Sequence, residues 1–473
     1  MSLSAELITL NGLTVRRSGQ PVLTDLTFTL RPGECWAVVG PTGSGKTTFL
    51  QTLAGQFHAP PDTLMRQART EFVSFKEESS RFSYSSYFYQ QRYQATMSDE
   101  GTDGSYSSTP TLRDFLQLTN TEESATLVDR LGLSPLLNRS FIKLSNGQTR
   151  KARIGKALLK HPSVLLLDSP FVGLDAISRA ELTDWLGELM HHGLTLMLVK
   201  EPDDIPAFVT HVVVLEKGRI AWSGPKEAYQ YSPPEPPSIA PPALQVSAPA
   251  PDFEEAFRLC DVTVRYGDTI ILDHIGWTVR TGERWALFGR NGAGKSVLLS
   301  LLYGDHPQAY SNDVRVFGHR RGKSGESIWD VKRRIGFISP ELHLYFPQNL
   351  TARQVALTGL TDTLTPPSQV AAVSEVDLSS LFAYFGLTQL LHRSFGTLSA
   401  GEQRLILLIR AFLKNAPVLL LDEPFQAIDH SHVQLARQLI DSFTNKTILF
   451  VTHDQSELPG SINQVFSIHV TAS

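Results

Sequence analysis

Cysteine is scarce in this sequence, which contains Cys35 and Cys260 and no other among its 473 residues. The two lie far apart and show no metal-type spacing, which argues against a disulfide framework and against an iron–sulfur domain. This usage suits a reducing compartment. A chain of this length is expected to form two or three domains, each with its own hydrophobic core.

Long apolar segments and a net basic charge are also absent. No uninterrupted apolar run approaches the roughly 20 residues that a membrane-spanning helix needs, and the start, MSLSAELITLNGLTV, lacks the basic-then-apolar pattern of a signal peptide. The formal net charge is −4, so no overall positive field favours nucleic acid or an anionic membrane. Any membrane role would therefore depend on partner subunits.

What the sequence does contain is a long internal repeat. LTVRRSGQPVLTDLTFTLRPGECWAVVGPTGSGKTTFL (13–50) aligns without a gap with VTVRYGDTIILDHIGWTVRTGERWALFGRNGAGKSVLL (262–299). Farther along, LLNRSFIKLSNGQTRKARIGKALLKHPSVLLLDSPF matches LLHRSFGTLSAGEQRLILLIRAFLKNAPVLLLDEPF, again without a gap. Agreement over whole blocks predicts two homologous domains, which we place at residues 1–230 and 253–473.

Two segments fall outside the repeat. Residues 231–252, YSPPEPPSIAPPALQVSAPAPD, are crowded with prolines, which remove amide donors and favour extended backbone. They fit a semi-rigid exposed linker and a disordered tail equally well. Residues 77–110, rich in serine, tyrosine and glycine, are expected to be a surface insertion in the first domain.

Each repeat alternates apolar strands with helices. WAVVG and WALFG are typical of buried strands, and a glycine-rich turn and an apolar helix follow each. VLLLD predicts a second buried strand in both halves, and LTLMLV or TILFVTH a third. Strands that alternate with helices indicate an α/β fold, with a parallel sheet covered by helices.

The glycine-rich turns carry the clearest chemistry. GPTGSGKT (40–47) and GRNGAGKS (289–296) both fit G-x-x-x-x-G-K-[ST], whose glycines let backbone N–H groups hold phosphate oxygens at a helix N-terminus. Lys46 and Lys295 would reach the β- and γ-phosphates, and the hydroxyls of Thr47 and Ser296 would ligate magnesium. The predicted nucleotide contacts are Gly40, Thr42, Gly43, Gly45, Lys46, Thr47 and Thr48 in the first copy, and Gly289, Asn291, Gly292, Gly294, Lys295 and Ser296 in the second.

A carboxylate follows each VLLL run. Asp168 and Asp422 end their strands beside the phosphate loop, where a carboxylate can hold the hydration shell of Mg²⁺. Together with Thr47 and Ser296 they form the predicted metal sites.

A third motif, LSNGQ (144–148) or LSAGE (398–402), precedes these strands. With it the sequence resembles the ATP-binding cassette (ABC) ATPases, which carry a signature loop of the LSGGQ form between phosphate loop and Walker B strand. The resemblance covers nearly the whole chain apart from linker and insertion. For each domain it implies a parallel-sheet core, an antiparallel β subdomain and a helical signature subdomain. It implies ATP and Mg²⁺ as ligands and hydrolysis to ADP and phosphate.

The resemblance also implies that the two cassettes pair head-to-tail within one chain, so that each ATP lies between one phosphate loop and the other cassette's signature. A signature serine and a helix N-terminus would then face the γ-phosphate. The first site would combine Lys46, Thr47 and Asp168 with Ser399 and Gly401, and the second Lys295, Ser296, Asp422 and Glu423 with Ser145 and Gly147.

The residue after the Walker B aspartate differs between the copies. In the family this residue polarises the attacking water, and Glu423 can accept a proton as a general base. Ser169, its counterpart in the first copy, is no substitute for a base at neutral pH.

Two further family positions differ in the same direction. The switch histidine that contacts the γ-phosphate matches His453, whereas the first copy has Glu201, which would repel phosphate. The aromatic residue that stacks on adenine matches Tyr266, whereas the first copy has Arg17, whose guanidinium can still stack. We therefore expect a first site that binds ATP without turnover, and a second site where Glu423, His453 and Lys295 are catalytic.

The family's Q-loop glutamine differs the other way. It matches Gln90 or Gln91 in the first copy, whereas IGFISPELH in the second offers Pro340 and Glu341. Coupling of the second site to a partner is therefore expected to be weak or unusual.

Within the family, residues 304–339 are similar to the ModF-type double ATPases, a group associated by name with molybdate transport and photorepair. This similarity implies a cytoplasmic ATPase, peripheral on the cytoplasmic face of the membrane at most, that belongs to, or works with, a transport system. An importer ATPase that drives separate membrane-spanning subunits is a second possibility. F-type ABC proteins, which act on the ribosome or on nucleic acid, are the rival. They typically keep the glutamate in both cassettes and have a long charged linker, which Ser169 and the proline-rich segment oppose. A stand-alone ATP-gated regulator is the last alternative.

One basic cluster bears on the rival. Its side chains could contact phosphates, but a solvated surface is the better interpretation. Its members are His319, Arg320, Arg321, Lys323, Lys332, Arg333 and Arg334.

Overall fold

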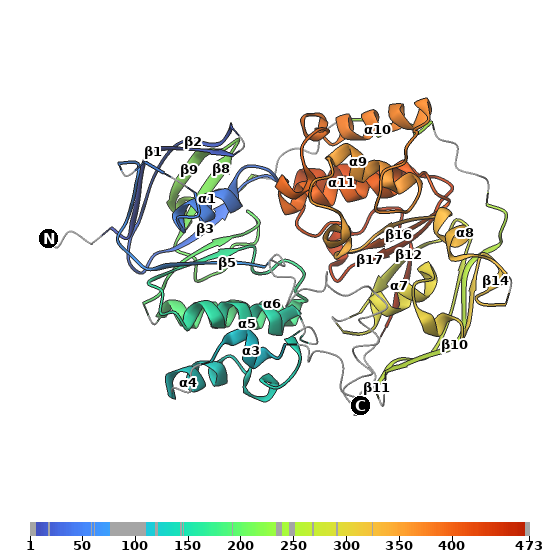
Figure 1. The fold of residues 1–473 in the computed structure, drawn as a ribbon, viewed down its shortest axis with the longest axis horizontal. Helices are drawn as coiled ribbons and strands as arrows, with labels where there is room; N and C mark the ends of the chain where they lie inside the picture. The colour runs from blue at the N-terminus through green and yellow to red at the C-terminus, as the bar shows by residue number, and fades with distance from the viewer. Residues whose placement is uncertain are drawn as a thin grey trace. The chain divides into compact units, whose positions relative to one another are not determined.

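The computed structural model describes residues 6–17, 19–57, 59–60, 62–75, 110–118, 122–141, 144, 146–191, 193–232, 239–245, 251–266, 269–289, 292–323 and 325–468. These residues divide into two compact units, residues 6–232 and residues 239–468, each built around its own sheets (Figure 1). The predicted insertion, apart from residue 110, and half of the predicted linker lie outside the described residues.

A mainly parallel sheet forms the centre of the first unit. Its strand order is β5 (Thr70–Ser74), β6 (Val164–Asp168), β7 (Thr195–Val199), β3 (Cys35–Val39), β8 (His211–Glu216) and β9 (Arg219–Pro225), and only the β8–β9 pair is antiparallel. Trp36 and Val38 of β3 join one core cluster, while Cys35, Ala37 and Val39 join another. The sheet is therefore buried on both faces, which explains why its strands are continuously apolar.

The second unit repeats this arrangement. Its sheet has the order β15 (Ile335–Ile338), β16 (Val418–Asp422), β17 (Thr447–Val451), β12 (Arg284–Phe288) and β18 (Gln464–Ser467), and all four pairs are parallel. The predicted parallel α/β core is confirmed in both units.

Each unit also has an antiparallel sheet. In the first it is β2 (Gln20–Leu30), β1 (Ile8–Arg17) and β4 (Leu64–Arg66). In the second it is β11 (Thr269–Arg280), β10 (Glu255–Tyr266), β13 (Asp313–Val316) and β14 (His319–Arg320). Arg17 pairs with Gln20 and Tyr266 with Thr269, so the strands that carry the predicted adenine contact end at the same place.

The helices fall into corresponding sets (Figure 1). The phosphate-loop helices are α1 (Lys46–Leu53) and α7 (Lys295–Tyr303), and each unit has a group of helices around the signature. The remaining α-helices are α3 (Leu112–Leu116), α4 (Glu122–Arg130), α5 (Asn146–Leu158), α6 (Ala176–His191), α8 (Ile328–Arg333), α9 (Ala352–Leu357), α10 (Ala372–Tyr384), α11 (Ala400–Leu413) and α12 (His430–Ser442). The 3-10 helices are η2 (Ser134–Leu136), η4 (Lys226–Ala228), η5 (Pro307–Ala309), η6 (Leu342–Tyr345), η7 (Thr358–Leu360), η8 (Thr388–Leu390), η9 (Phe395–Thr397) and η10 (Gln455–Glu457).

Part of the proline-rich segment is held against the second unit. The Leu244 side chain packs on its core, and the Gln245 N–H donates to Asp377 Oδ1 at 2.8 Å. Among the described residues, no helix combines the length and apolarity needed to cross a bilayer.

Candidate nucleotide-binding sites

Both glycine-rich loops adopt the backbone that phosphate binding requires. Gly43 and Gly45 have φ of 77° and 100°, and Gly292 and Gly294 have φ of 82° and 92°. This left-handed backbone, which glycine adopts without strain, turns successive N–H groups toward one side. The last glycine of each loop is the N-cap of the following helix, so the loop leads directly into a helix N-terminus.

Gly40 is required at the start of the first loop. Its φ is 146°, and a Cβ there would overlap the carbonyl oxygen of Leu215. Gly289 is less constrained, since a Cβ would lie 3.0 Å from the carbonyl oxygen of Ile468.

The two phosphate-loop lysines make the same contact. Lys46 Nζ donates to the carbonyls of Gly40 at 2.6 Å and Pro41 at 2.8 Å, and Lys295 Nζ donates to the carbonyl of Gly289 at 2.5 Å. Each ammonium thus lies over its own loop, where it can also reach phosphate oxygens held by that loop. Asn291, another predicted contact, lies outside the described residues.

The two predicted metal ligands of the first cassette are adjacent. Thr47 Oγ1 donates to Asp168 Oδ1 at 3.1 Å, and the carboxylate is buried at the end of β6. A hydroxyl and a carboxylate oxygen at the end of a phosphate loop are hard oxygen donors of the type that Mg²⁺ prefers. Thr48, predicted as a nucleotide contact, has a buried side chain, and its carbonyl accepts from Thr52 Oγ1.

In the second cassette, the surroundings of the Asp422 carboxyl would favour a bound cation. Burial and the nearby Glu423 carboxylate raise the pKa of Asp422 from 3.8 to about 7, although Arg404 and Lys295 act to lower it. A cation at this carboxylate would favour its ionised form. Ser296, the other predicted ligand, is the second residue of α7 and is exposed.

Glu423 and His453 are in direct contact. His453 Nδ1 lies 3.0 Å from Oε1 and 2.9 Å from Oε2 of Glu423, so its N–H donates to both carboxylate oxygens. Their side chains are 13% and 18% exposed, which leaves the pair open to a small reactant. The structure thus brings together the predicted general base and the predicted switch histidine from the ends of β16 and β17.

The equivalent pair is missing from the first cassette. Ser169 follows Asp168, and Glu201 occupies the place of His453 after β7. Lys200, whose side chain is 3% exposed, pairs with Glu201 at 3.1 Å and also with Asp204. The prediction that Glu201 repels phosphate did not take Lys200 into account. The buried ammonium of this lysine offsets the charge of Glu201.

An arginine that the sequence analysis missed holds the end of β16, the strand that leads to Glu423 in the second cassette. Arg404 of α11 is buried, and its guanidinium donates to the carbonyls of Asp422 at 2.9 Å, Pro424 at 3.3 Å, and Glu423. It also donates to the carbonyl of Ser339, after β15, at 2.6 Å. One side chain therefore fixes both the backbone that carries Glu423 and the start of the Q-loop.

In the first cassette two arginines share this work. Arg150 donates to the carbonyls of Ser169 at 3.4 Å and Val172, and Arg153 donates to the carbonyl of Ser74 at 3.1 Å. Arg150 and Arg404 occupy the same position in the gapless alignment of the two repeats. This shared arginine is the feature of the sequence that could have pointed to their common role.

The signature loop is described in the second unit. Ser399 is the N-cap of α11, where its Oγ accepts from the Glu402 N–H at 3.2 Å and its N–H donates to Glu402 Oε2 at 2.7 Å. Gly401 is buried in the first turn of this helix, and Gly147 lies in the first turn of α5. Ser145 lies outside the described residues.

Of the predicted Q-loop residues, only those of the second cassette are described. Glu341 is near enough to Asp422 that its charge contributes to the raised pKa of that carboxyl. The Pro340 carbonyl accepts from His343 Nδ1 at 2.8 Å. Gln90 and Gln91 lie outside the described residues.

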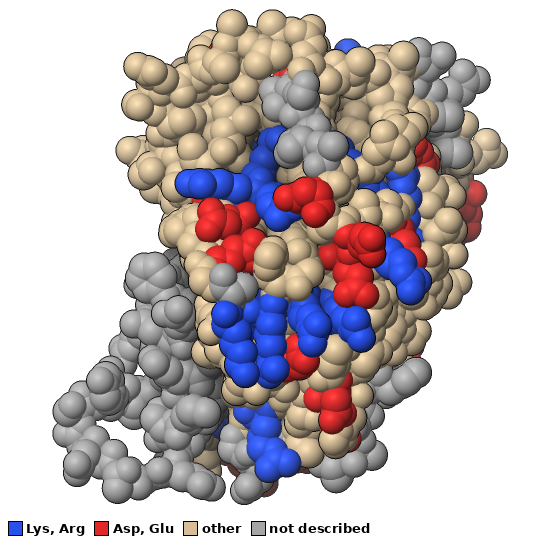
Figure 2. Space-filling view, turned by 90° about the vertical axis from the view of Figure 1, so that its right-hand side faces the viewer, with Lys and Arg blue, Asp and Glu red and all other residues tan. Residues whose placement is uncertain are grey.

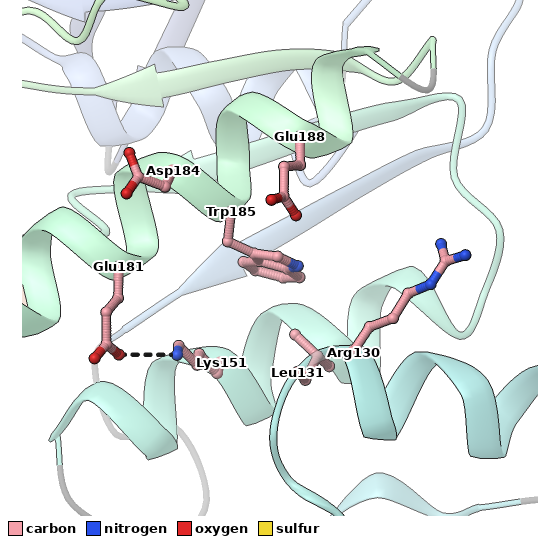
Figure 3. A pocket seen from close by; sticks show the side chains of 7 residues that line it. All are labelled: Arg130, Leu131, Lys151, Glu181, Asp184, Trp185 and Glu188. Carbon is pink, nitrogen blue, oxygen red and sulfur yellow. Dashed lines mark hydrogen bonds and ion pairs between the residues drawn. The ribbon is translucent and has the colours of Figure 1, made fainter.

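A separate pocket of about 230 Å³ lies among α4, α5 and α6 of the first unit (Figure 3). Lys151 pairs there with Glu181 at 3.1 Å, and the Trp185 ring lies among the charged side chains. It contains none of the predicted nucleotide contacts and is not part of the site. Its lining residues are Arg130, Leu131, Lys151, Glu181, Asp184, Trp185 and Glu188.

The predicted basic cluster is largely neutralised. Figure 2 shows a face on which lysine and arginine side chains are interleaved with aspartate and glutamate. Arg321 of the cluster is buried. The ion pairs of the cluster are Arg320 with Asp313, Arg321 with Glu326, Lys332 with Asp305, Arg333 with Asp330, and Arg334 with Asp252.

Comparison with known proteins agrees with this geometry. The ABC transporter family model matches residues 23–172 and 272–426. The chain is 35% identical over 477 residues to the ABC transporter ATP-binding protein ModF of Escherichia coli, covering 95% of this chain and 94% of that protein. It is 31% identical over 465 residues to an uncharacterized ABC transporter ATP-binding protein of Schizosaccharomyces pombe, covering 94% of each.

Two solved structures resemble both units in fold. One is titled a complex of an archaeal ribosomal stalk protein with the ribosome recycling factor aABCE1 (TM-score 0.54, 17% identity, 96% of this chain and 87% of that chain). The other is titled a model of ribosome-bound archaeal Pelota and ABCE1 (TM-score 0.58, 18% identity, 94% of this chain and 74% of that chain). With two family matches and relatives that align along nearly its whole length, the chain belongs to the ABC transporter ATP-binding family and carries two cassettes.

Proposed function

We propose that this protein hydrolyses ATP at its second cassette and binds ATP without turnover at its first. The observation that carries this proposal is the contact of His453 Nδ1 with both oxygens of Glu423, at 3.0 and 2.9 Å. The first cassette has Ser169 and Glu201 at the same two positions. One site therefore has an oriented base and the other has none.

The proposed reaction uses these side chains in simple roles. Glu423 accepts a proton from the attacking water, whose oxygen bonds to the γ-phosphorus while the bond to the bridging β–γ oxygen breaks. The His453 N–H holds the carboxylate in its orientation, and the Lys295 ammonium offsets charge on the phosphate oxygens. Mg²⁺ held by Ser296 and Asp422 would supply further positive charge at the phosphates.

We further propose that the cassettes pair head-to-tail in one chain. The second site would then receive Ser145 and Gly147, and the first would receive Ser399 and Gly401. The position of Ser399 at the N-terminus of α11 supports this role, since the helix dipole gives this end positive partial charge. The Glu402 carboxylate, which accepts from the Ser399 N–H at 2.7 Å, offsets part of that charge. Stable binding at the first site, with Thr47 and Asp168 holding Mg²⁺, would keep the pair closed while the second site turns over.

The cellular role that we favour is as the ATPase of, or an ATPase associated with, a transport system with separate membrane-spanning subunits. The likeness to ModF supports it, since that relative is called an ABC transporter ATP-binding protein. Action on the ribosome or on nucleic acid is the alternative, suggested by the titles of two structural neighbours. Those neighbours share under a fifth of their residues with this chain, and the ion pairs of the basic cluster leave few free cations for phosphates.

The test of the reaction compares two substitutions at equivalent positions. We expect Glu423→Gln to abolish ATP turnover while preserving ATP binding, whereas Ser169→Ala changes turnover by less than about two-fold. Equal losses from both substitutions would contradict two unlike sites.

The cellular role is tested with the same variant. Tagged Glu423→Gln protein should remain in its ATP-bound form, so native lysate fractionated with ATP reports its partner. Co-purification with specific membrane proteins supports the transport role, and co-purification with ribosomes or nucleic acid supports the alternative.

A further inference from the structure

A buried histidine outside the nucleotide motifs contacts the predicted adenine-stacking residue. His306 Nε2 lies 2.6 Å from Tyr266 Oη, and the His306 side chain is fully buried. His306 Nδ1 accepts from the Gln308 N–H at 3.1 Å. Because a neutral imidazole has one donor and one acceptor nitrogen, Nε2 carries the proton and donates to the tyrosine hydroxyl.

The segment that carries His306 also holds the end of β10. The Gln308 side chain accepts from the Arg265 N–H at 3.2 Å and donates to the Arg265 carbonyl at 2.7 Å. The Asn312 side chain makes the same two contacts with Thr263, at 3.0 and 3.1 Å. These side-chain amides pair with the backbone as a neighbouring strand would, so they hold the last residues of β10 in place.

This segment is tied to the phosphate loop as well. The His306 N–H donates to the carbonyl of Ser300, in the helix that begins at Lys295. A continuous path of hydrogen bonds therefore runs from the phosphate-loop helix through His306 to the Tyr266 ring.

Among the described residues, the first cassette has different side chains at the two corresponding positions. Arg17 stands where the second cassette has Tyr266. Counted from the phosphate-loop lysine, Phe57 stands where the second cassette has His306, and Phe57 packs against the core of the first unit. In the second cassette the histidine and the tyrosine therefore occur together, and in the first cassette Arg17 and Phe57 stand in their places.

We infer that His306 is a positioning residue for Tyr266, and that it holds the ring in the orientation in which it stacks on the nucleobase at the second site. The inference rests on the proposed ATP binding at that site. Stacking strength depends on how the ring is placed against the base, and the contact with His306 holds the hydroxyl end of a ring whose other face packs against the core. His306 should therefore govern the part of the affinity that comes from the base, and not the part that comes from the phosphates.

The experiment separates these two parts by using a ligand without a base. Affinities for fluorescent mant-ATP and for tripolyphosphate are measured with Mg²⁺ in the full chain carrying Lys46→Ala, which weakens binding at the first site. We compare His306→Phe, His306→Gln, Tyr266→Phe and the double variant His306→Phe/Tyr266→Phe. We expect His306→Phe to weaken mant-ATP binding roughly 3- to 10-fold while tripolyphosphate binding changes less than two-fold.

The other variants make the result decisive. Tyr266→Phe should match His306→Phe, the double variant should lose nothing more, and His306→Gln, whose amide can donate to the hydroxyl, should recover most of the affinity. A parallel loss of tripolyphosphate binding, an unchanged mant-ATP affinity, or additive losses in the double variant would each overturn the inference. Because binding is measured, a protein that binds but does not hydrolyse ATP would overturn the proposed turnover and leave this inference standing.

Discussion

Ser169 and Glu423 occupy the same backbone position and share an unusual conformation. Each follows the aspartate that ends its strand, and their φ values are 58° and 46°. Non-glycine residues seldom adopt this left-handed region unless the surroundings hold them there. An arginine donates to the carbonyl of each, Arg150 to Ser169 and Arg404 to Glu423. The first cassette has thus lost the carboxylate and kept the backbone that would present it.

This relationship predicts that the first site can be repaired in two steps. In a Glu423→Gln background, Ser169→Glu should leave turnover at background, because Glu201 cannot orient the new carboxylate as His453 orients Glu423. Adding Glu201→His supplies an imidazole and should give measurable ATP hydrolysis. Phosphate release under saturating ATP is the measurement.

Activity from Ser169→Glu alone would show that the histidine is dispensable. No activity from the double variant, with ATP still bound, would show that a further residue of the first cassette blocks the reaction. The buried ammonium of Lys200 is the candidate for that residue.

Removal of the imidazole is the second prediction. His453→Ala deletes the donor to Glu423 while the carboxylate remains, so turnover should fall about 100-fold with ATP affinity little changed. Steady-state kcat and equilibrium ATP binding are measured together. Glu201→Ala, at the same place in the first cassette, is the matched control and should alter kcat by less than about two-fold.

The sequence predicts the parts of this protein that depend on local pattern. The apolar runs became the buried strands, and the phosphate-loop glycines have the backbone that their motif requires, since both properties are determined within a few residues. The contacts of Arg404 with the strand end and of His306 with Tyr266 span 18 and 40 residues or more. No periodicity or motif marks such pairs, because they exist only once separate elements have packed. Lys200 shows the same limit, since the sequence does not reveal that its ammonium is buried and paired with Glu201.

The hydrogen bonds of Arg404 should contribute strongly to the stability of the second unit. Arg404→Ala leaves two buried and two half-buried carbonyls without their donor, so the free energy of unfolding of the second unit should fall by roughly 2–4 kcal/mol. Turnover of the remaining folded protein should fall as well, because the backbone under Glu423 is no longer held. Urea unfolding and kcat are measured on the same samples.

A surface arginine provides the comparison for Arg404. Arg437 donates to the Ser456 carbonyl in an exposed hydrogen bond of 3.2 Å, and Arg437→Ala should cost less than about 0.5 kcal/mol. Similar losses from the two substitutions would mean that the carbonyl contacts of Arg404 contribute little.

The metal ligands predict different effects at the two sites. Asp422→Asn should abolish turnover, because it removes the charge that would hold Mg²⁺ where hydrolysis is proposed. Asp168→Asn removes the negative charge beside Thr47 and keeps a side-chain oxygen that can accept from the Thr47 hydroxyl. It should instead reduce the amount of ATP retained per chain, with a smaller effect on turnover. Retained nucleotide is measured after rapid gel filtration with and without Mg²⁺, and equal retention by both variants would argue against separate roles.

His306 should make the second unit sensitive to acid. Burial lowers the pKa of the His306 imidazole from 6.5 to about 4. Between these values the unfolded chain binds a proton that the folded chain does not, so stability present above pH 6.5 is lost as the pH falls toward 4. At about 1.4 kcal/mol per pKa unit, the full contribution is about 3 kcal/mol. Urea unfolding of wild type and His306→Gln at pH 7, 6, 5 and 4.5 should therefore show that the free energy of unfolding falls less steeply with acid in the variant.

His319→Gln, which changes an exposed histidine of β14, is the control and should keep the pH dependence of the wild type. The same pH dependence in all three proteins would mean that His306 is already protonated in the folded chain.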